Sequence, residues 1–262
     1  KGCEVEATGI AGKRVLVTGA SRGIGYEVAK GFAEAGADVW ILAETDDALT
    51  AAGRLAHASG RNVAGLVADV TDQTQIRQAV GAMPVLDVLV HNAGIEYLTP
   101  VLDPSPEVDA TFRRIIEVNL IGAWHVARAA VGRMTAGGRI IFTASGWSKT
   151  AEAEFGGYVA SKHGVLGLTR AMARELGTKG ITVNAVCPGW VRTELAMRSL
   201  RTMAAKQGRA EADVLREILA AQSIPKLLEP HEVVGAYLFL ASDLAADVTG
   251  QGLNVDRGWV MS

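Results

Sequence analysis

A glycine-rich turn lies between a predicted strand and a predicted helix close to the beginning of the sequence. The strand covers residues 14–18, the helix covers residues 24–35, and Gly19, Gly23 and Gly25 follow the spacing Gly-x3-Gly-x-Gly. Because glycine has no Cβ, such a turn lets a pyrophosphate approach backbone N–H groups and the N-terminus of the helix. This order of elements predicts a dinucleotide-binding unit, and a plain tight turn is the alternative.

The alternation of strand and helix continues through the rest of the chain. Apolar runs bounded by turn residues predict further strands at residues 39–42, 63–68, 85–90, 139–143, 181–186 and 252–255. Apolar residues at helical spacing predict helices at residues 46–59, 72–82, 106–134, 157–178 and 229–241. Seven strands with intervening helices indicate an α/β fold, a Rossmann-like doubly wound parallel sheet with helices on both faces. In such sheets the site lies at the carboxyl ends of the strands.

The length and composition of the chain bound its domain organisation. A chain of 262 residues, of which 49% are hydrophobic and 21% charged, suits a single domain with a sizeable core. We assign this domain to residues 12–262 and expect residues 1–11 to form an N-terminal arm outside it. Residues 194–223 form a long segment of mixed character, which we interpret as a lid over the substrate site.

The charge pattern argues against nucleic acid and membrane partners. The formal net charge is −2, and the Lys and Arg residues are scattered along the chain. No apolar run approaches the roughly 18 residues of a membrane span, and the first residues are too polar for a signal peptide. Cys3 and Cys187 match neither a disulfide framework nor a metal site. We therefore expect a cytoplasmic protein with reduced thiols, no metal and small-molecule ligands.

A serine, a tyrosine and a lysine form a candidate catalytic set. Ser145 follows the predicted strand 139–143 and so lies at its carboxyl end, while Tyr158 and Lys162 share one face of the next helix. A phenol that exchanges protons near neutrality must lose about three units from its free pKa of about 10. A lysine ammonium within roughly 4 to 6 Å lowers such a pKa by about 1 to 3 units, and an oxidised nicotinamide ring adds a second positive charge. Tyr-x3-Lys also occurs by chance, so the position of Ser145 strengthens the inference.

Further motifs occur in a fixed order along the chain. They are Thr18-Gly19-Ala20-Ser21-Arg22-Gly23-Ile24-Gly25, Asn92-Ala93-Gly94, Asn119, Ser145, Tyr158-x3-Lys162 and Pro188-Gly189. Through them the chain resembles the short-chain dehydrogenase/reductase family along nearly its whole length. The resemblance implies that Tyr158 is the general acid/base, that Lys162 lowers its pKa and holds the nicotinamide ribose, and that Ser145 orients the substrate oxygen. It also implies that Asn119 anchors a water that links Lys162 to solvent, although a polar residue inside a helix can instead satisfy backbone groups.

The resemblance also implies a nicotinamide cofactor and assigns its contacts. Asp69 and Val70 would bind the adenine, Asn92 the adenosine ribose and Thr193 the nicotinamide amide. The full set of implied cofactor residues is Gly19, Ser21, Arg22, Gly23, Ile24, Gly25, Glu44, Asp69, Val70, Asn92, Ala93, Gly94, Tyr158, Lys162, Pro188, Gly189, Val191 and Thr193.

Two residues bear on the choice between NAD and NADP. Glu44 follows the second strand, where the chain reaches the adenosine ribose, and its carboxylate can accept hydrogen bonds from free ribose hydroxyls. A 2′-phosphate there would meet a repulsion of about 4 kcal/mol per pair of unit charges before screening, at about 4 Å and an effective dielectric constant of about 20. Arg22 acts in the opposite direction, because NADPH enzymes of this family often use such a residue near the 2′-phosphate. We therefore expect NAD, with NADP as the second choice.

The family position of several residues predicts the substrate site. These residues are Glu96, Ser145, Trp147 and Trp190. The tryptophans can present flat faces to a ring or sugar, or they can simply pack the lid. Glu96 and Glu152 can accept hydrogen bonds from substrate hydroxyls. Lys149 and Arg192 offer the alternative of an acidic substrate.

The resemblance implies an oxidoreductase that transfers a hydride between a nicotinamide cofactor and a secondary alcohol or ketone. We expect a small hydroxylated or cyclic substrate, similar to a polyol or sugar, and a homotetramer with helices 106–134 and 157–178 at an interface. An NADPH-dependent carbonyl or 3-oxoacyl reductase is the nearer alternative. A regulatory protein that binds the cofactor without chemistry is a distant one, because it would not need to keep Ser145, Tyr158 and Lys162.

Three residues depart from the family pattern, and one of them is Glu44, which follows the second strand. His91 stands where Asn is common, and we interpret it as structural although it lies close to the cofactor region. Arg257 stands where Gly is usual, and we interpret it as a candidate for a subunit contact.

Overall fold

Seven parallel strands form the centre of the computed structural model, which describes residues 9–261. In chain order they are β1 (Arg14–Thr18), β2 (Asp38–Ala43), β3 (Val63–Val67), β4 (Val88–His91), β5 (Arg139–Thr143), β6 (Thr182–Pro188) and β7 (Gly252–Val255). Their order across the sheet is β3-β2-β1-β4-β5-β6-β7, so the chain first builds on one side of β1 and then, from β4 onward, on the other. This is the doubly wound parallel sheet that the alternation of elements predicted.

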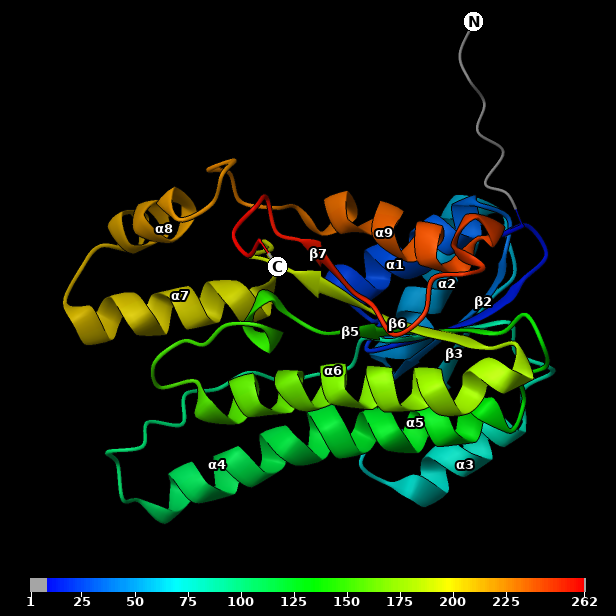
Figure 1. Ribbon diagram of the computed structural model, residues 1–262, viewed down its shortest axis with the longest axis horizontal. Coiled ribbons are helices and arrows are strands. Elements are labelled where there is room, and N and C mark those ends of the chain that lie inside the picture. Colours follow the sequence, from blue (N-terminus) through cyan, green and yellow to red (C-terminus); the bar gives the residue numbers. More distant parts are fainter. Residues whose placement is uncertain (1–8, 262) are drawn as a thin grey trace, which may run out of the picture.

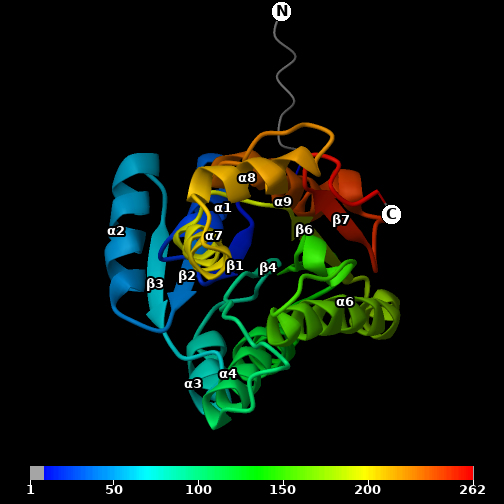
Figure 2. The ribbon, with the colours of Figure 1, turned by 90° about the vertical axis from the view of Figure 1, so that its left-hand side faces the viewer.

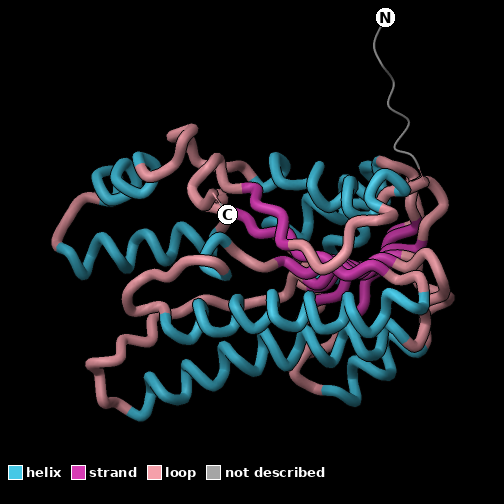
Figure 3. The backbone as a smooth tube through the Cα atoms, in the orientation of Figure 1, coloured by secondary structure: helices cyan, strands magenta, loops and turns pink. Residues whose placement is uncertain are grey.

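Helices cover both faces of the sheet. In chain order they are α1 (Gly23–Glu34), α2 (Asp47–Ser59), α3 (Gln73–Gly81), α4 (Pro106–Ile116), α5 (Gly122–Val131), α6 (Gly156–Leu176), α7 (Glu194–Gln207), α8 (Glu211–Ala220) and α9 (Val234–Ala241). Figure 1 shows α1, α2 and α9 on one face of the sheet, with α3, α5 and α6 on the other. Figure 2, turned by 90°, shows α1 and α9 on one side of the strands and α3 and α6 on the other. Figure 3 shows the strands enclosed between these two layers, with α7 and α8 extending past one end.

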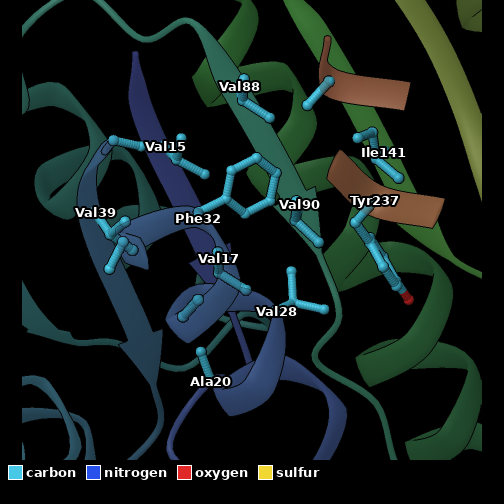
Figure 4. Packing of buried hydrophobic residues seen from close by; sticks show 14 of the residues in the cluster. Val15, Val17, Ala20, Val28, Phe32, Val39, Val88, Val90, Ile141 and Tyr237 are labelled. Atoms are coloured by element: carbon cyan, nitrogen blue, oxygen red, sulfur yellow. The ribbon is translucent and has the colours of Figure 1, made fainter. Parts of the chain in front are cut away.

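Strand residues are buried alternately in two cores, because helices cover both faces of the sheet. Val15 and Val17 of β1 face the core shared with α1, α2 and α9, whereas Leu16 faces the core shared with α3, α5 and α6. Phe32 of α1 packs among the valines of β1 and β4 in the first core (Figure 4). Burial on both faces explains why the strands appear in the sequence as continuous apolar runs.

The reversal of strand order between β1 and β4 places the candidate site. Thr18 pairs with His91 at the last position of the β1–β4 register, so Gly19 and Asn92 leave the sheet side by side. Thr143 pairs with Val186 in the neighbouring strands β5 and β6, which end at the same edge. A crevice at such a reversal is the usual ligand site of an open parallel sheet.

Two helical segments differ from the prediction in their internal geometry. Residues 106–134 contain α4 and α5 joined by a π-helical turn, Glu117–Ile121, which includes Asn119. Residues 229–241 begin with a 3-10 turn, Pro230–Val233, before α9. Because π-helical turns occur frequently at functional sites, the turn at Asn119 marks this part of the helix for attention.

Residues 9–11, expected to belong to an N-terminal arm, lie against the domain. Ile10 is fully buried in the core shared with α1 and α9, and the backbone N–H of Gly12 donates to the Gly36 carbonyl at 2.9 Å. The prediction is therefore wrong for residues 9–11, because burial of the isoleucine side chain ties this segment to the fold. Residues 1–8, the rest of the expected arm, lie outside the described residues.

The segment expected to form a lid, residues 194–223, consists mainly of α7 and α8. Both helices lie beyond the carboxyl ends of the strands (Figure 1). Leu200 of α7 and Val214 of α8 pack with Trp147 and Trp190 in a third apolar cluster. Within residues 9–261, no helix has the length and apolar character needed to cross a membrane.

Candidate active site

A cavity of about 600 Å³ opens at the carboxyl edge of the sheet, between the strand ends and the start of α7. This volume is typical of a small-molecule site. Every catalytic, cofactor and substrate residue predicted above lines this cavity, except Gly25 and Asn119. Glu152, the second carboxylate considered for substrate hydroxyls, is not among the lining residues.

The glycine turn is packed too tightly for side chains. Gly19 has a φ of 62°, and a Cβ on it would lie 2.6 Å from the Cα of Ala93. A Cβ on Gly25 would lie 2.4 Å from the carbonyl oxygen of Gly19, and the Asn92 Nδ2 donates to that same oxygen at 3.0 Å. Gly23 and Ile24, the first residues of α1, line the cavity, so the N-terminus of this helix is open to a ligand such as the pyrophosphate of a dinucleotide.

A buried threonine and histidine fix the loop that follows β4. Thr18 Oγ1 accepts hydrogen bonds from the backbone N–H groups of Asn92 and Ala93 at 3.1 and 3.2 Å, so its own proton goes to His91 Nδ1 at 3.0 Å. Burial, and secondly the charge of Lys162, lower the pKa of His91 to about 3. His91 is therefore neutral and positions the loop, as the structural interpretation expected.

Lys162 carries a buried ammonium in the floor of the cavity. Its Nζ donates to the carbonyl oxygen of Thr143, at the end of β5, at 2.8 Å and lies 5.6 Å from the centroid of the Tyr158 ring. Burial lowers the pKa of Lys162 to about 8, although the charge of Glu96 acts in the opposite direction. Most of the lysine population is thus cationic at neutral pH.

Ser145 and Tyr158 lie together above this lysine. Ser145 Oγ accepts a hydrogen bond from the Trp147 N–H at 3.1 Å, and Ser145 also hydrogen-bonds the Tyr158 side chain. Burial and then the charge of Glu96 raise the pKa of Tyr158, whereas the bond with Ser145 lowers it. The tyrosine is therefore a protonated phenol in the protein alone, and its activation needs a further positive charge.

Asn119 holds the loop that passes over Lys162. Its Oδ1 accepts from the Ile95 N–H at 2.8 Å, and its Nδ2 donates to the Ile95 carbonyl at 2.9 Å and to Ser161 Oγ at 3.0 Å. A Cβ on Gly94 would lie 3.2 Å from Asn119 Oδ1 and 3.5 Å from Lys162 Nζ. The side chain thus satisfies backbone groups, which was the alternative considered from the sequence.

Charged residues surround the end of the cavity where the adenosine ribose is expected. Glu44 lies at the cavity edge, and Arg114 Nη2 is 3.9 Å from its Oε1 and 3.7 Å from Asp69 Oδ2. Arg22, the other cation, lies 3.6 Å from Glu194 at the start of α7. Arg22 therefore links the glycine turn to the lid and leaves Glu44 with Arg114 as its partner.

The two tryptophans both line the cavity and pack the lid. Trp147 and Trp190 are almost fully buried, and their ring centroids lie 6.0 Å apart in an edge-to-face contact. Trp147 also meets the Tyr158 ring edge to face at 5.9 Å, which helps to hold the phenol in place.

The cations proposed for an acidic substrate are engaged elsewhere. Arg192 Nε pairs with Glu229 at 2.8 Å, and Lys149 Nζ donates to the Gly252 carbonyl at 2.9 Å. Lys149 lines a separate surface groove and neither residue lines the main cavity. The structure thus gives the acidic-substrate alternative no support from these two side chains.

Comparison with known proteins decides the family. A family model described as Enoyl-(Acyl carrier protein) reductase matches residues 19–260. A short-chain dehydrogenase/reductase of Armillaria gallica is 35% identical over 258 residues, which cover 95% of this chain and 96% of that protein. The chain belongs to the short-chain dehydrogenase/reductase family.

Other members of the family match over a similar length. D-beta-hydroxybutyrate dehydrogenase of Cupriavidus necator is 37% identical over 257 residues, covering 95% of this chain and 98% of that enzyme. The crystal structure of a variant actinorhodin polyketide ketoreductase with NADPH has a TM-score of 0.87 and 32% identity, covering 96% of this chain and 98% of that chain. These matches confirm the family resemblance inferred from the motifs.

Three residues that line the cavity were not predicted from the sequence. They are Arg114 of α4, Arg198 of α7 and Trp259, which follows β7. No local sequence signal separates them from ordinary surface or terminal residues, because their position depends on how distant elements pack.

Arg257, considered for a subunit contact, pairs with Glu232 at 2.9 Å within the chain. Its φ is 57°, in the region that usually favours glycine.

Gly19→Ala tests the glycine turn. Because the added Cβ meets backbone atoms of Ala93 and the residue has a positive φ, we expect the dissociation constant for NADH to rise at least about tenfold. Fluorescence titration with NADH measures this constant. Gly53→Ala is the matched control, because Gly53 lies in α2 with open space around it, and it should bind NADH as wild type does. Wild-type affinity in Gly19→Ala would show that the turn is not a cofactor contact.

Proposed function

We propose that this protein is an NAD-dependent dehydrogenase that oxidises a secondary alcohol to a ketone. The observation that supports this most strongly is that Ser145, Tyr158 and Lys162 line one cavity with the glycine turn. In that turn, a Cβ at Gly19 or Gly25 would clash with backbone atoms. We propose a small hydroxylated or cyclic substrate, similar to a polyol or sugar, because the aromatic wall of Trp147 and Trp190 is joined by the carboxyl group of Glu96.

Proton transfer is the task of Tyr158 in this proposal. Its ionised hydroxyl takes the proton of the substrate alcohol, while Ser145 hydrogen-bonds the reacting oxygen. Lys162 stabilises the phenolate through its positive charge, and the Thr143 carbonyl keeps the ammonium in position. The glycine turn, Asn92 and Thr193 would hold the nicotinamide cofactor, which would supply the hydride acceptor.

The required pKa change sets the scale of this activation. Ionisation near neutrality means a fall of about three units from about 10, or on the order of 4 kcal/mol. One positive charge within about 4 to 6 Å supplies about 1 to 3 units. Lys162 alone is therefore insufficient in a site where burial raises the pKa of Tyr158, and an oxidised nicotinamide ring, when bound, would supply a second positive charge.

Tyr158→Phe tests the catalytic assignment. The ring still packs against Trp147 but lacks the exchangeable proton, so we expect alcohol oxidation to fall about a hundred- to ten-thousandfold while NADH affinity stays within a few-fold of wild type. Tyr26→Phe, on α1 and outside the cavity, should retain wild-type turnover. The assay is nicotinamide absorbance with a panel of secondary alcohols. Retention of more than about a tenth of the rate in Tyr158→Phe would mean that Tyr158 is not the acid/base.

The preference for NAD rests on Glu44. Its carboxylate lies at the cavity edge and would repel a 2′-phosphate, whereas free ribose hydroxyls can donate to it. Arg114 reduces that repulsion only modestly, because the two side chains are 3.9 Å apart and both largely exposed.

An NADPH-dependent carbonyl or 3-oxoacyl reductase is the second candidate. Arg22 and Arg114 both line the adenosine side of the cavity and can supply positive charge to a phosphate. The similar structure of actinorhodin polyketide ketoreductase contains NADPH, which supports the same alternative.

Glu44→Arg distinguishes the two cofactors. We expect wild type to have the higher kcat/KM with NAD, and the substitution to move the NAD-to-NADP ratio at least about tenfold toward NADP by removing a repulsive charge and adding a phosphate ligand. Glu175→Arg makes the same charge change on an exposed part of α6 outside the cavity and should leave the ratio unchanged. A wild-type ratio that favours NADP, or one that Glu44→Arg does not move, would contradict this role of Glu44.

A further inference from the structure

A buried carboxyl group lies in the cavity beside the catalytic set. Glu96 follows the Asn92-Ala93-Gly94 loop, has only 6% of its surface exposed and lines the same cavity as Tyr158 and Lys162. Its charge acts on both of these residues. Burying a carboxylate away from water costs free energy unless the group is hydrogen-bonded or paired with a positive charge.

The lid helix α7 supplies the polar neighbours of Glu96. Ser199 Oγ donates to Glu96 Oε1, and Glu96 lines the cavity. Arg198 Nη2 bonds the backbone carbonyl of Glu96 at 2.7 Å, while its guanidinium lies 4.4 Å from the centroid of the Tyr97 ring. Within residues 9–261, then, Arg198 is held by a carbonyl and a ring, and the carboxylate has a serine as its hydrogen-bond donor.

Aromatic rings line the same cavity as this carboxyl group. Trp259 and Trp190 each meet Trp147 edge to face, at centroid distances of 6.4 and 6.0 Å, and all three line the cavity. Ring faces carry negative charge density and attract cations. The carboxylate and the rings favour hydrogen-bond donors and positive charge beside Glu96. The two cations that act on Glu96 are already engaged, Lys162 by the Thr143 carbonyl and Arg198 by the Glu96 carbonyl and the Tyr97 ring.

We infer that Glu96 selects substrates by charge: it binds a hydroxyl or ammonium donor that the substrate carries near the reacting carbinol, and it excludes a carboxylate from that position. This inference rests on the proposed alcohol oxidation and names the substrate class of the same cavity. Ser199 holds Glu96 in place from the lid, so it acts as a positioning residue for the selecting carboxylate.

The charge state of Glu96 makes this selection between substrates depend on pH. Burial raises the pKa of Glu96 to about 7, while the Ser199 hydrogen bond, Arg198 and Lys162 act in the opposite direction. The carboxyl group is therefore mostly neutral below about pH 7 and mostly ionised above it. Tyr158 and Lys162 of α6 and Arg198 of α7 are the other titratable or charged groups that act on it. Discrimination against an anionic substrate should thus increase as the pH rises through 7.

Three alcohols with one four-carbon skeleton test the inference: 4-aminobutan-2-ol is cationic, butane-1,3-diol is neutral and 3-hydroxybutyrate is anionic. In wild type we expect kcat/KM for the amine and the diol to exceed that for the acid at least about tenfold at pH 8, and the ratio to shrink at pH 6. Glu96→Gln keeps the shape and removes the charge, so the ratio of amine to acid should fall at least about tenfold and its pH dependence should weaken, with Lys162 as the remaining group that titrates near pH 8. Ser199→Ala retains the charge of Glu96, so its kcat/KM should still be higher for the amine than for the acid.

The outcomes separate the inference from the proposed function. A wild-type preference for 3-hydroxybutyrate, or a ratio that Glu96→Gln leaves unchanged, overturns the role of Glu96 while alcohol oxidation stands. If none of the three compounds is oxidised, the proposed small-alcohol substrate fails, and calorimetric binding of the same compounds to the complex with NAD decides the role of Glu96. Tighter binding of the amine that is lost in Glu96→Gln supports it, and equal or absent binding in both proteins refutes it.

Discussion

The site depends on one buried ammonium group held at the end of a central strand. Lys162 Nζ donates to the Thr143 carbonyl at 2.8 Å, in the floor of a cavity formed by the strand ends. An unpaired buried cation costs several kcal/mol, so the lysine stays charged only where carbonyl groups and nearby negative charge compensate. Its pKa falls to about 8, which leaves it mostly cationic at neutral pH. The phenol of Tyr158 and the carboxyl group of Glu96 are both arranged around this charge.

The loop after β4 brings its backbone close to the Lys162 ammonium group. Gly94 has no side chain, so the loop after β4 can pass within contact distance of Lys162 and of Asn119 in the π-helical turn. The hydroxyl of Thr18 ties the same loop to β1, where Gly19 approaches Ala93. The parallel sheet creates this meeting of loops because its strand order reverses between β1 and β4.

Much of the fold and the site could be predicted from the sequence, because alternation of strands and helices and the spacing of motifs are local properties. Ser145, Tyr158 and Lys162 lie together as their places at a strand end and on one helix face indicated. Contacts between distant segments could not be predicted. Arg114 lies on a helix surface in the sequence pattern, and only the packing of α4 beside the ends of β2 and β3 brings it to Glu44 and Asp69. The bond from Ser199 to Glu96 likewise depends on where the lid rests, and the burial of Ile10 depends on the core that receives it.

The most direct test of this account is the ionisation of Tyr158, followed by ultraviolet difference spectroscopy between wild type and Tyr158→Phe, with and without NAD. The account predicts that the pKa of Tyr158 is above its ordinary value in the protein alone and falls by at least about 2 units when NAD binds. It also predicts that the fall is smaller in Lys162→Met, which keeps the length of the side chain but removes its charge. A tyrosine pKa that NAD does not change, or one that falls equally without the lysine charge, would contradict it.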